Sequence, residues 1–69
     1  MKEKLESLVV ELIEKRIYLE EAVDAFEKKF IQTALAKTGG NQSKAAVVLG
    51  VHRNTLSRKI TQHKLNGRR

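Results

Sequence analysis

The apolar residues of this 69-residue chain recur every three or four positions, which is the period of an α-helix rather than of a strand. Residues 5–17 place apolar side chains at this spacing, with charged residues at the complementary positions, and so predict an amphipathic helix. A second helix is predicted from about Leu19 to Lys37, with Glu20 and Glu21 in its first turn as the helix dipole favours. Its apolar band is wider than one partner helix requires.

Glycines divide the rest of the pattern. Gly39 and Gly40 end the second helix, and one of them suits the left-handed conformation that follows a last helical turn. Asn41 can cap a third helix, because its short side chain accepts a hydrogen bond from a free backbone N–H group. We expect that helix from about Gln42 to Leu49, and Gly50 ends it after two turns.

A fourth helix is expected from about Arg53 to Lys64. Leu56 and Ile60 form its buried face, and Leu65 closes over the core. The side chains expected to point outward are Arg53, Ser57, Arg58 and Thr61. The pattern therefore predicts an all-α domain of four helices, one pair over residues 1–38 and a second pair over residues 39–65. Residues 66–69 are expected to form a flexible basic tail.

Composition excludes several classes of protein. The chain has no cysteine, and its two histidines, His52 and His63, have no acidic residue near them in the sequence, so a disulfide framework and a metal site are not expected. No apolar run reaches the roughly 18 residues of a membrane span, and no export leader is visible, so we expect a cytoplasmic protein without membrane contact. A chain this short can hardly build a substrate pocket, so neither an enzyme nor a cofactor or small-molecule site is expected.

The charges are unevenly distributed. Residues 1–33 carry six basic and eight acidic side chains, a net charge of −2, whereas residues 34–69 carry eight basic and no acidic ones, a net charge of +8. A cationic half suits a polyanion, an anionic membrane surface or an acidic protein, and a merely solvated basic face is the alternative. Because the basic residues are interleaved with an apolar helical pattern, nucleic acid is the leading candidate.

The segment from Gln42 to Ile60 fits a helix-turn-helix. Such a unit needs a small residue in its first helix, a residue that tolerates positive φ four positions later, and an apolar residue to plug the turn; Ala46, Gly50 and Val51 match. An Ala-x-x-x-Gly pair alone also occurs in ordinary helical hairpins. A hairpin, however, has no need for a second helix whose exposed face is cationic and free of acidic residues.

These residues also resemble a known family. The stretches from Gly39 to Ala46 and from Leu49 to Ile60 are similar to the Fis-type helix-turn-helix, and the stretch from Phe26 to Ile31 is similar to the preceding helix of that family. The resemblance spans about residues 18–65. Within the family, the stretch from Arg53 to Ile60 most resembles the C-terminal DNA-binding domains of NtrC-class activators.

The resemblance implies a bacterial, nucleoid-associated protein that regulates transcription. NtrC-class domains follow an ATPase that remodels RNA polymerase carrying sigma-54, often within a two-component system. Residues 1–69 hold no phosphate-binding glycine loop of such an ATPase, so we expect a domain excised from a longer protein, with Met1 added. Fis itself begins with a hairpin arm, for which no strand-like segment is seen.

Site residues follow from the geometry of a recognition helix, which reads bases from its N-terminal part in the major groove. Arg53 is the first candidate, because its guanidinium matches the O6 and N7 atoms of guanine, and Arg58 is the second. Asn54 is a further candidate. His52 is either a base contact or a cap of the helix. The expected phosphate ligands are Asn41, Ser43, Lys44, Thr55, Ser57 and Lys59. Asn41 could equally be a cap alone, and Lys59 could be solvated.

The first two helices predict a homodimer, because their apolar surface exceeds what two short helices can cover. The residues expected in the interface are Leu5, Leu8, Leu12, Val23, Phe26 and Phe30. The resemblance implies a four-helix bundle that presents two recognition helices to a two-fold symmetric duplex, with bending of the DNA. Three functions stay open at this point: an activator's DNA-binding domain, a free-standing Fis-like protein that bends DNA, and an adaptor that docks an acidic protein.

Overall fold

The computed structural model describes residues 1–65 as four helices. They are α1 (Lys2–Glu14), α2 (Leu19–Lys37), α3 (Gln42–Leu49) and α4 (Arg53–Gln62). The all-α class and the bounds of α2 and α3 agree with the sequence prediction. Residues 66–69, for which we predicted a flexible basic tail, lie outside the described residues.

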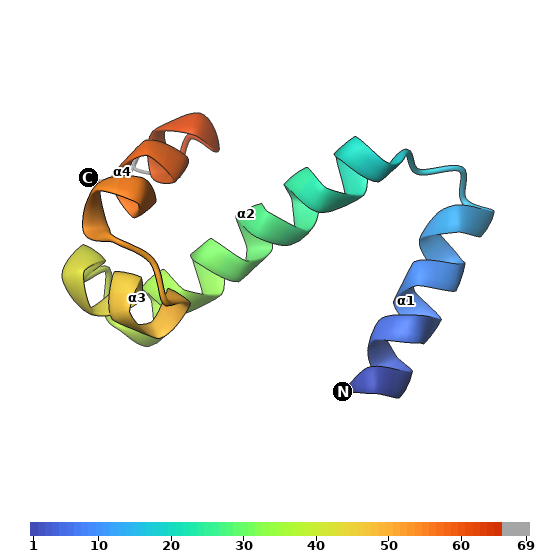
Figure 1. Cartoon of the computed structure of the whole chain (residues 1–69), viewed down its shortest axis with the longest axis horizontal. Helices are drawn as coiled ribbons and strands as arrows, with labels where there is room; N and C mark the ends of the chain where they lie inside the picture. Colours follow the sequence, from blue (N-terminus) through green and yellow to red (C-terminus); the bar gives the residue numbers. More distant parts are fainter. Residues whose placement is uncertain (66–69) are drawn as a thin grey trace.

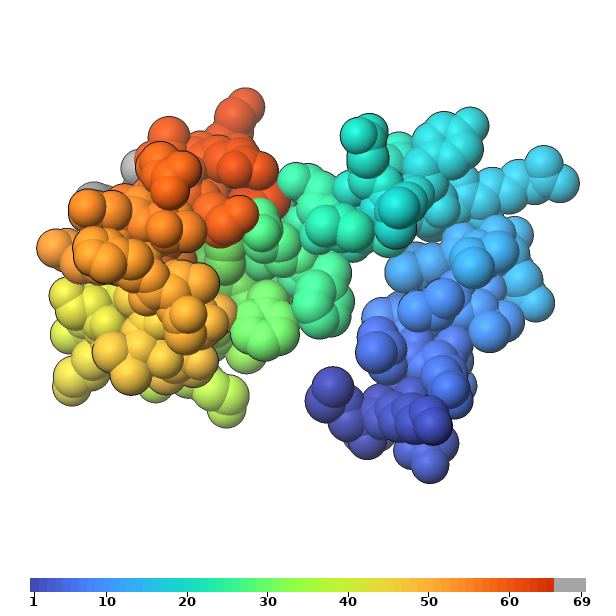
Figure 2. All heavy atoms as spheres, in the orientation of Figure 1, coloured from blue at the N-terminus to red at the C-terminus, as the bar shows by residue number. Residues whose placement is uncertain are grey.

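The long helix α2 organises the chain, as Figure 1 shows. Helices α3 and α4 pack on one another and on α2, whereas α1 stands apart at the other end, joined to α2 by residues 15–18. The radius of gyration is 13.5 Å, against roughly 11 Å for a compact domain of this length. The spheres of Figure 2 show open space between α1 and the α3 side of the molecule.

The core lies where α2, α3 and α4 meet. Its buried apolar side chains are Ile31, Ala34, Ala45, Ala46, Leu56 and Ile60. The partly buried residues packed against them are Leu35, Leu49 and Leu65, as expected for Leu65. Within the described residues, α1 contributes nothing to this core.

Helix α1 begins and ends three residues earlier than the predicted 5–17. The chain turns at Arg16, which adopts a left-handed φ of 63°, and the N–H of Ile17 returns to the carbonyl of Leu12 at 3.0 Å. This is the hydrogen bond of a Schellman C-cap, formed here without glycine. At the next helix the carboxylate of Glu21 accepts a hydrogen bond from the backbone N–H of Tyr18 at 3.1 Å, which fixes the start of α2.

Helix α4 ends two residues earlier than the predicted Lys64. Lys64 has a left-handed φ of 58°, and the N–H of Leu65 bonds to the carbonyl of Ile60 at 2.9 Å. The chain therefore folds back beneath the last turn, with His63 at the C-cap. This turn brings Leu65 against the core.

Of the described helices, none combines the length and the apolar character that a membrane crossing requires.

Candidate nucleic-acid interface

Two side-chain caps fix the starts of α3 and α4. The Asn41 side chain accepts a hydrogen bond from the N–H of Lys44 at 3.0 Å, as predicted for a cap. His52 Nδ1 accepts one from the N–H of Asn54 at 3.2 Å. Both residues are exposed, so the caps do not prevent either side chain from facing a ligand. The cap role of His52, one of its two predicted roles, is thus present in the structure.

The turn between α3 and α4 has the predicted glycine. Gly50 adopts φ 71° and ψ 30°, the left-handed conformation that other residues enter only at a cost. The N–H groups of Gly50 and Val51 bond to the carbonyls of Val47 and Ala46, at 3.1 and 3.0 Å, and close the end of α3. Val51 is 37% exposed and lies outside the core cluster, so it plugs the turn less completely than expected.

Helix α4 has the two faces that the sequence predicts. Leu56 and Ile60 are buried against α3 and α2. The exposed residues of the helix include Arg53, Asn54, Ser57, Arg58 and Thr61. The four-residue separation of Leu56 and Ile60 is one helical turn, so burying both leaves the opposite side of the helix to solvent.

Two long polar contacts involve residues of this exposed face. The Ser57 hydroxyl lies 3.4 Å from Gln42 Oε1 at the start of α3, and Arg58 Nη2 lies 3.4 Å from the Thr55 hydroxyl. Both distances exceed the usual length of such bonds, so these groups can exchange partners readily. Of the predicted phosphate ligands, Ser43 and Lys44 are exposed in the first turn of α3, as is Ser57 on α4, whereas Thr55 is half-buried.

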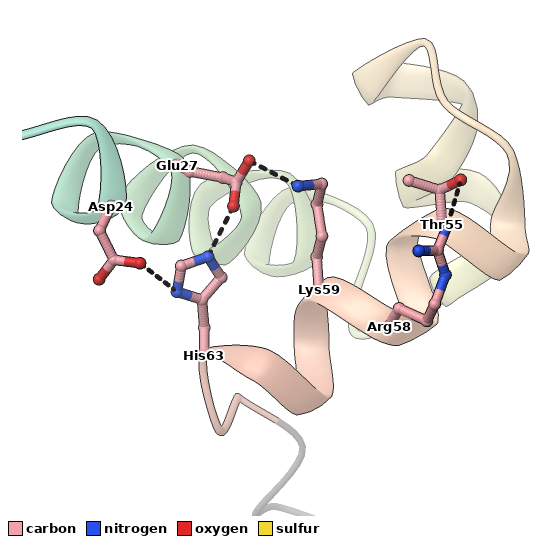
Figure 3. A network of polar contacts seen from close by, with 6 residues as sticks. All are labelled: Asp24, Glu27, Thr55, Arg58, Lys59 and His63. Carbon is pink, nitrogen blue, oxygen red and sulfur yellow. Dashed lines mark hydrogen bonds and ion pairs between the residues drawn. The ribbon is translucent and has the colours of Figure 1, made fainter. Parts of the chain in front are cut away.

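Lys59 has a different position from the other predicted phosphate ligands. Its Nζ atom lies 2.8 Å from Glu27 Oε2 on α2 and is therefore turned toward the body of the protein (Figure 3). The other oxygen of the same carboxylate, Oε1, lies 2.8 Å from His63 Nε2. The hydrogen bond from Lys59, followed by that from His63, holds the pKa of Glu27 below its ordinary value of 4.5.

His63 is buried, with 7% of its surface exposed, and its Nδ1 atom lies 3.6 Å from Asp24 Oδ1. We expected this histidine to cover the edge of the core, but its carboxylate partners were not predicted. They lie 36 and 39 positions away in the sequence, and no local motif signals such a pair. Among residues 1–65, no group of His, Asp and Glu side chains is arranged to hold a metal ion.

A profile described as "Bacterial regulatory protein, Fis family" matches residues 22–63, more than half of the chain and all of α3 and α4. The chain belongs to the Fis family of bacterial regulatory proteins. This family membership confirms the helix-turn-helix and the Fis-type resemblance, and it confirms that the chain is not an enzyme.

Curated relatives are similar over more than half of the chain. A protein of Neisseria meningitidis named "Putative Fis-like DNA-binding protein" is 51% identical over 39 residues, which cover 56% of this chain and 49% of that protein. A protein of Ralstonia nicotianae with the same name is 42% identical over 43 residues, 62% of this chain and 56% of its own. The chain thus spans about half the length of the curated relatives it matches. No solved structure gave a significant match.

Proposed function

We propose that this chain binds double-stranded DNA as a homodimer and serves as the DNA-binding unit of a bacterial transcription regulator. The observation that carries the proposal is the exposed face of α4, which presents Arg53, Asn54 and Arg58 beyond a capped N-terminus and has no acidic residue. The Fis-family match and the names of the relatives support the same function.

Reading of bases is assigned to the first turns of α4. Arg53 and Asn54 stand in the first turn, where a recognition helix meets the base edges, and Arg58 follows on the exposed face. His52 accepts the N–H of Asn54 through Nδ1, so its neutral form carries its proton on Nε2, and that group can donate to a base or a phosphate.

Phosphate binding is assigned to the polar residues around the turn. The proposed ligands are Asn41, Ser43, Lys44, Thr55 and Ser57. They fix the register of the unit on the duplex without reading its sequence. Lys59 is set apart from them because it is bound to Glu27.

The dimer is proposed from two apolar surfaces that lack a partner within the described chain. On α1 the exposed side chains include Leu5, Leu8, Val9 and Ile13, and Leu12 is only partly covered. On α2, Val23, Phe26 and Phe30 are exposed, and the two phenylalanine rings are in contact, with centroids 5.5 Å apart and planes tilted by 56°. Phe26, Phe30 and Val48 also line an apolar groove of about 300 Å³.

A second copy is the occupant that these surfaces fit. It would supply a second amphipathic α1 and a second apolar face of α2. The exposed apolar side chains of each copy would then pack against those of the other in a four-helix bundle. A two-fold arrangement of this type also presents two copies of α4 to one duplex, which suits a two-fold symmetric site.

The class of regulator is proposed from the amino-acid sequence of α4. The stretch from Arg53 to Ile60 resembles the DNA-binding domains of NtrC-class activators. In such a protein this unit would bring the sigma-54-dependent activator to its DNA site. The second candidate is a free-standing Fis-like protein that bends DNA with little sequence preference. The names of the relatives, which call them Fis-like DNA-binding proteins, favour a Fis-like protein.

Selection of bound duplexes from a random DNA pool tests the proposal and separates the two candidates. Strong enrichment of a two-fold symmetric motif is the result expected for the activator class. Binding with little enrichment beyond flexible A·T-rich centres would favour the DNA-bending protein. Recovery of no DNA would contradict both and would point to docking of an acidic protein.

Replacement of Arg53 by alanine gives a second prediction. If this guanidinium reads a guanine, Arg53→Ala should cost about 1–3 kcal/mol on the enriched duplex and leave binding to random DNA nearly unchanged. Fluorescence anisotropy with both duplexes measures the two affinities. An equal loss on both would instead assign Arg53 to phosphate.

A further inference from the structure

Helix α4 is attached to α2 by polar contacts in addition to the apolar core. Lys59 on α4 and His63 at the C-cap of that helix, four residues later, bind the two oxygens of a single carboxylate, that of Glu27, at 2.8 Å each. Figure 3 shows both side chains pointing from α4 toward this one group on α2. The contact therefore joins two points of the recognition helix to one point of the helix beneath it.

The contact lies in a partly dry environment. His63 is buried, and the side chains of Lys59 and Glu27 are 35% and 32% exposed. Screening by water is weaker there than for an exposed pair such as Lys15 with Glu11. Loss of the carboxylate would leave a buried imidazole and a partly buried ammonium without their acceptor.

Directional contacts of this kind fix the rotation of a helix, which apolar packing alone leaves free. Leu56 and Ile60 hold α4 against the core, but hydrophobic contact is non-directional and tolerates small rotations of a helix. Two hydrogen bonds to one carboxylate do not tolerate them, because bond strength falls steeply with distance and angle. Arg53 and Arg58 are carried on the same helix, so the setting of α4 decides where their guanidinium groups meet the duplex.

We propose that Glu27 is a positioning residue for DNA recognition, which holds α4 through Lys59 and His63 and so sets the aim of Arg53 and Arg58. The inference rests on the proposed DNA binding. Lys59 then acts through Glu27 and is not a phosphate ligand.

The two roles of Lys59 predict opposite effects of one substitution. In Glu27→Gln the amide keeps the size of the carboxylate but not its charge, so the ion pair with Lys59 is lost, and the amide can contact both partners only if His63 Nε2 accepts from its NH2 group. If Glu27 positions α4, the variant binds the enriched duplex less tightly. If Lys59 is a phosphate ligand, removal of its competitor Glu27 makes the variant bind all DNA more tightly.

The experiment compares the parent chain with Glu27→Gln, Lys59→Gln and the double variant. For each, anisotropy titrations give the affinity for the duplex enriched in the selection, the affinity for a random duplex, and the dependence of both on salt. The ratio of the two affinities does not depend on the folded fraction of the sample, because unfolded chains lower both equally. A merely structural role would therefore leave this ratio unchanged.

We expect the ratio to fall about tenfold in each single variant, equivalent to about 1.4 kcal/mol. The double variant should be no worse than either single one, because both remove the same contact. The salt slope should stay that of the parent. Asp24→Asn is the matched control, since it removes the same charge from α2 at a side chain that is 62% exposed and 3.6 Å from His63, and it should keep the parent's ratio.

An unchanged ratio in Glu27→Gln would overturn the inference. So would a Lys59→Gln variant that loses affinity for both duplexes with a salt slope reduced by about 0.9, the signature of one lost phosphate contact. A parent chain that binds no duplex would contradict the proposed function itself, which keeps the two failures distinguishable.

Discussion

The two ends of this molecule differ in what covers their apolar side chains. At one end α3, α4 and the C-terminal part of α2 bury Leu56, Ile60 and the small residues between them. At the other end α1 and the N-terminal part of α2 also carry large apolar side chains, yet these stay exposed, as in Phe26 at 52%. We call these the closed end and the open end.

Similar amphipathic patterns can therefore be buried within one chain or remain exposed. At the closed end the apolar stripe meets partners within 35 residues of the same chain, because two tight turns fold α3 and α4 back onto α2. At the open end the turn at Arg16 directs α1 away from the core, so its stripe has no such partner in the described chain. We assign the open end to association and the closed end to presentation of α4.

The largest expected effect comes from a charge on the open end. Phe26→Glu should prevent dimerisation, because an unpaired carboxylate is costly to bury in an apolar interface. Affinity for the two-fold symmetric duplex should fall roughly a thousandfold, to the level of non-specific binding. Anisotropy titration measures it, and Phe26→Leu, which keeps an apolar surface, should bind like the parent. A Glu variant with the parent's affinity would refute the dimer.

The next largest effect is a difference in unfolding free energy between a substitution at the closed end and one at the open end. Leu56→Ala removes a fully buried side chain at the closed end and should lower the free energy of unfolding by about 2–5 kcal/mol. Leu5→Ala, on exposed α1, should change the unfolding of the monomer by only about 0.5 kcal/mol. Urea unfolding at several protein concentrations separates the two contributions. Equal losses for both variants in dilute solution would show that α1 packs on its own chain.

A smaller effect is expected at the turn of the closed end. A Cβ atom on residue 50 would meet no atom within 4 Å, so Gly50→Ala is not a steric problem. Its cost comes from the left-handed backbone and should be about 1–2 kcal/mol of unfolding free energy. Gly50→Asn is the control and should cost less, since asparagine tolerates this conformation. If alanine proved neutral, the turn would be free to change its conformation.

The smallest effect concerns pH. The pKa of Glu27 is lowered by Lys59 and His63, so its stabilising contribution is present above pH 4.5 and is lost as the pH falls through its pKa in the folded protein. The difference in thermal midpoint between the parent and Glu27→Gln should therefore be constant near neutral pH and shrink below pH 4.5. Circular dichroism melts over this range measure it. A difference that grows in acid would have the wrong sign.

Much of the closed end could be predicted from the sequence because its signals are local. The cap at Asn41, the left-handed glycine at position 50 and the buried pair Leu56 and Ile60 each follow from residue type and spacing. The predicted boundaries of α1 were wrong by three residues, and the predicted C-terminal end of α4 was wrong by two. Arg16 and Lys64 stop these helices in a left-handed conformation that their residue types do not favour, so no glycine or proline marks the boundary.

The contact of Glu27 with Lys59 and His63 could not be predicted for a different reason. Lys59 and His63 follow Glu27 by 32 and 36 residues in the sequence. They meet it only because the turns after α2 and α3 fold α4 back across α2. From the sequence, Lys59 looked like part of the cationic face. The crossing of α4 over α2 instead places it beside an acidic residue of the first half of the chain.

We propose that a second copy of the chain covers the apolar side chains of the open end. Sedimentation equilibrium of the parent chain, at the concentrations at which it binds DNA, tests it most directly. We expect twice the 7.8 kDa mass of one chain for the parent, and 7.8 kDa for Phe26→Glu. A parent chain that sediments at 7.8 kDa and still binds a two-fold symmetric duplex tightly would contradict it.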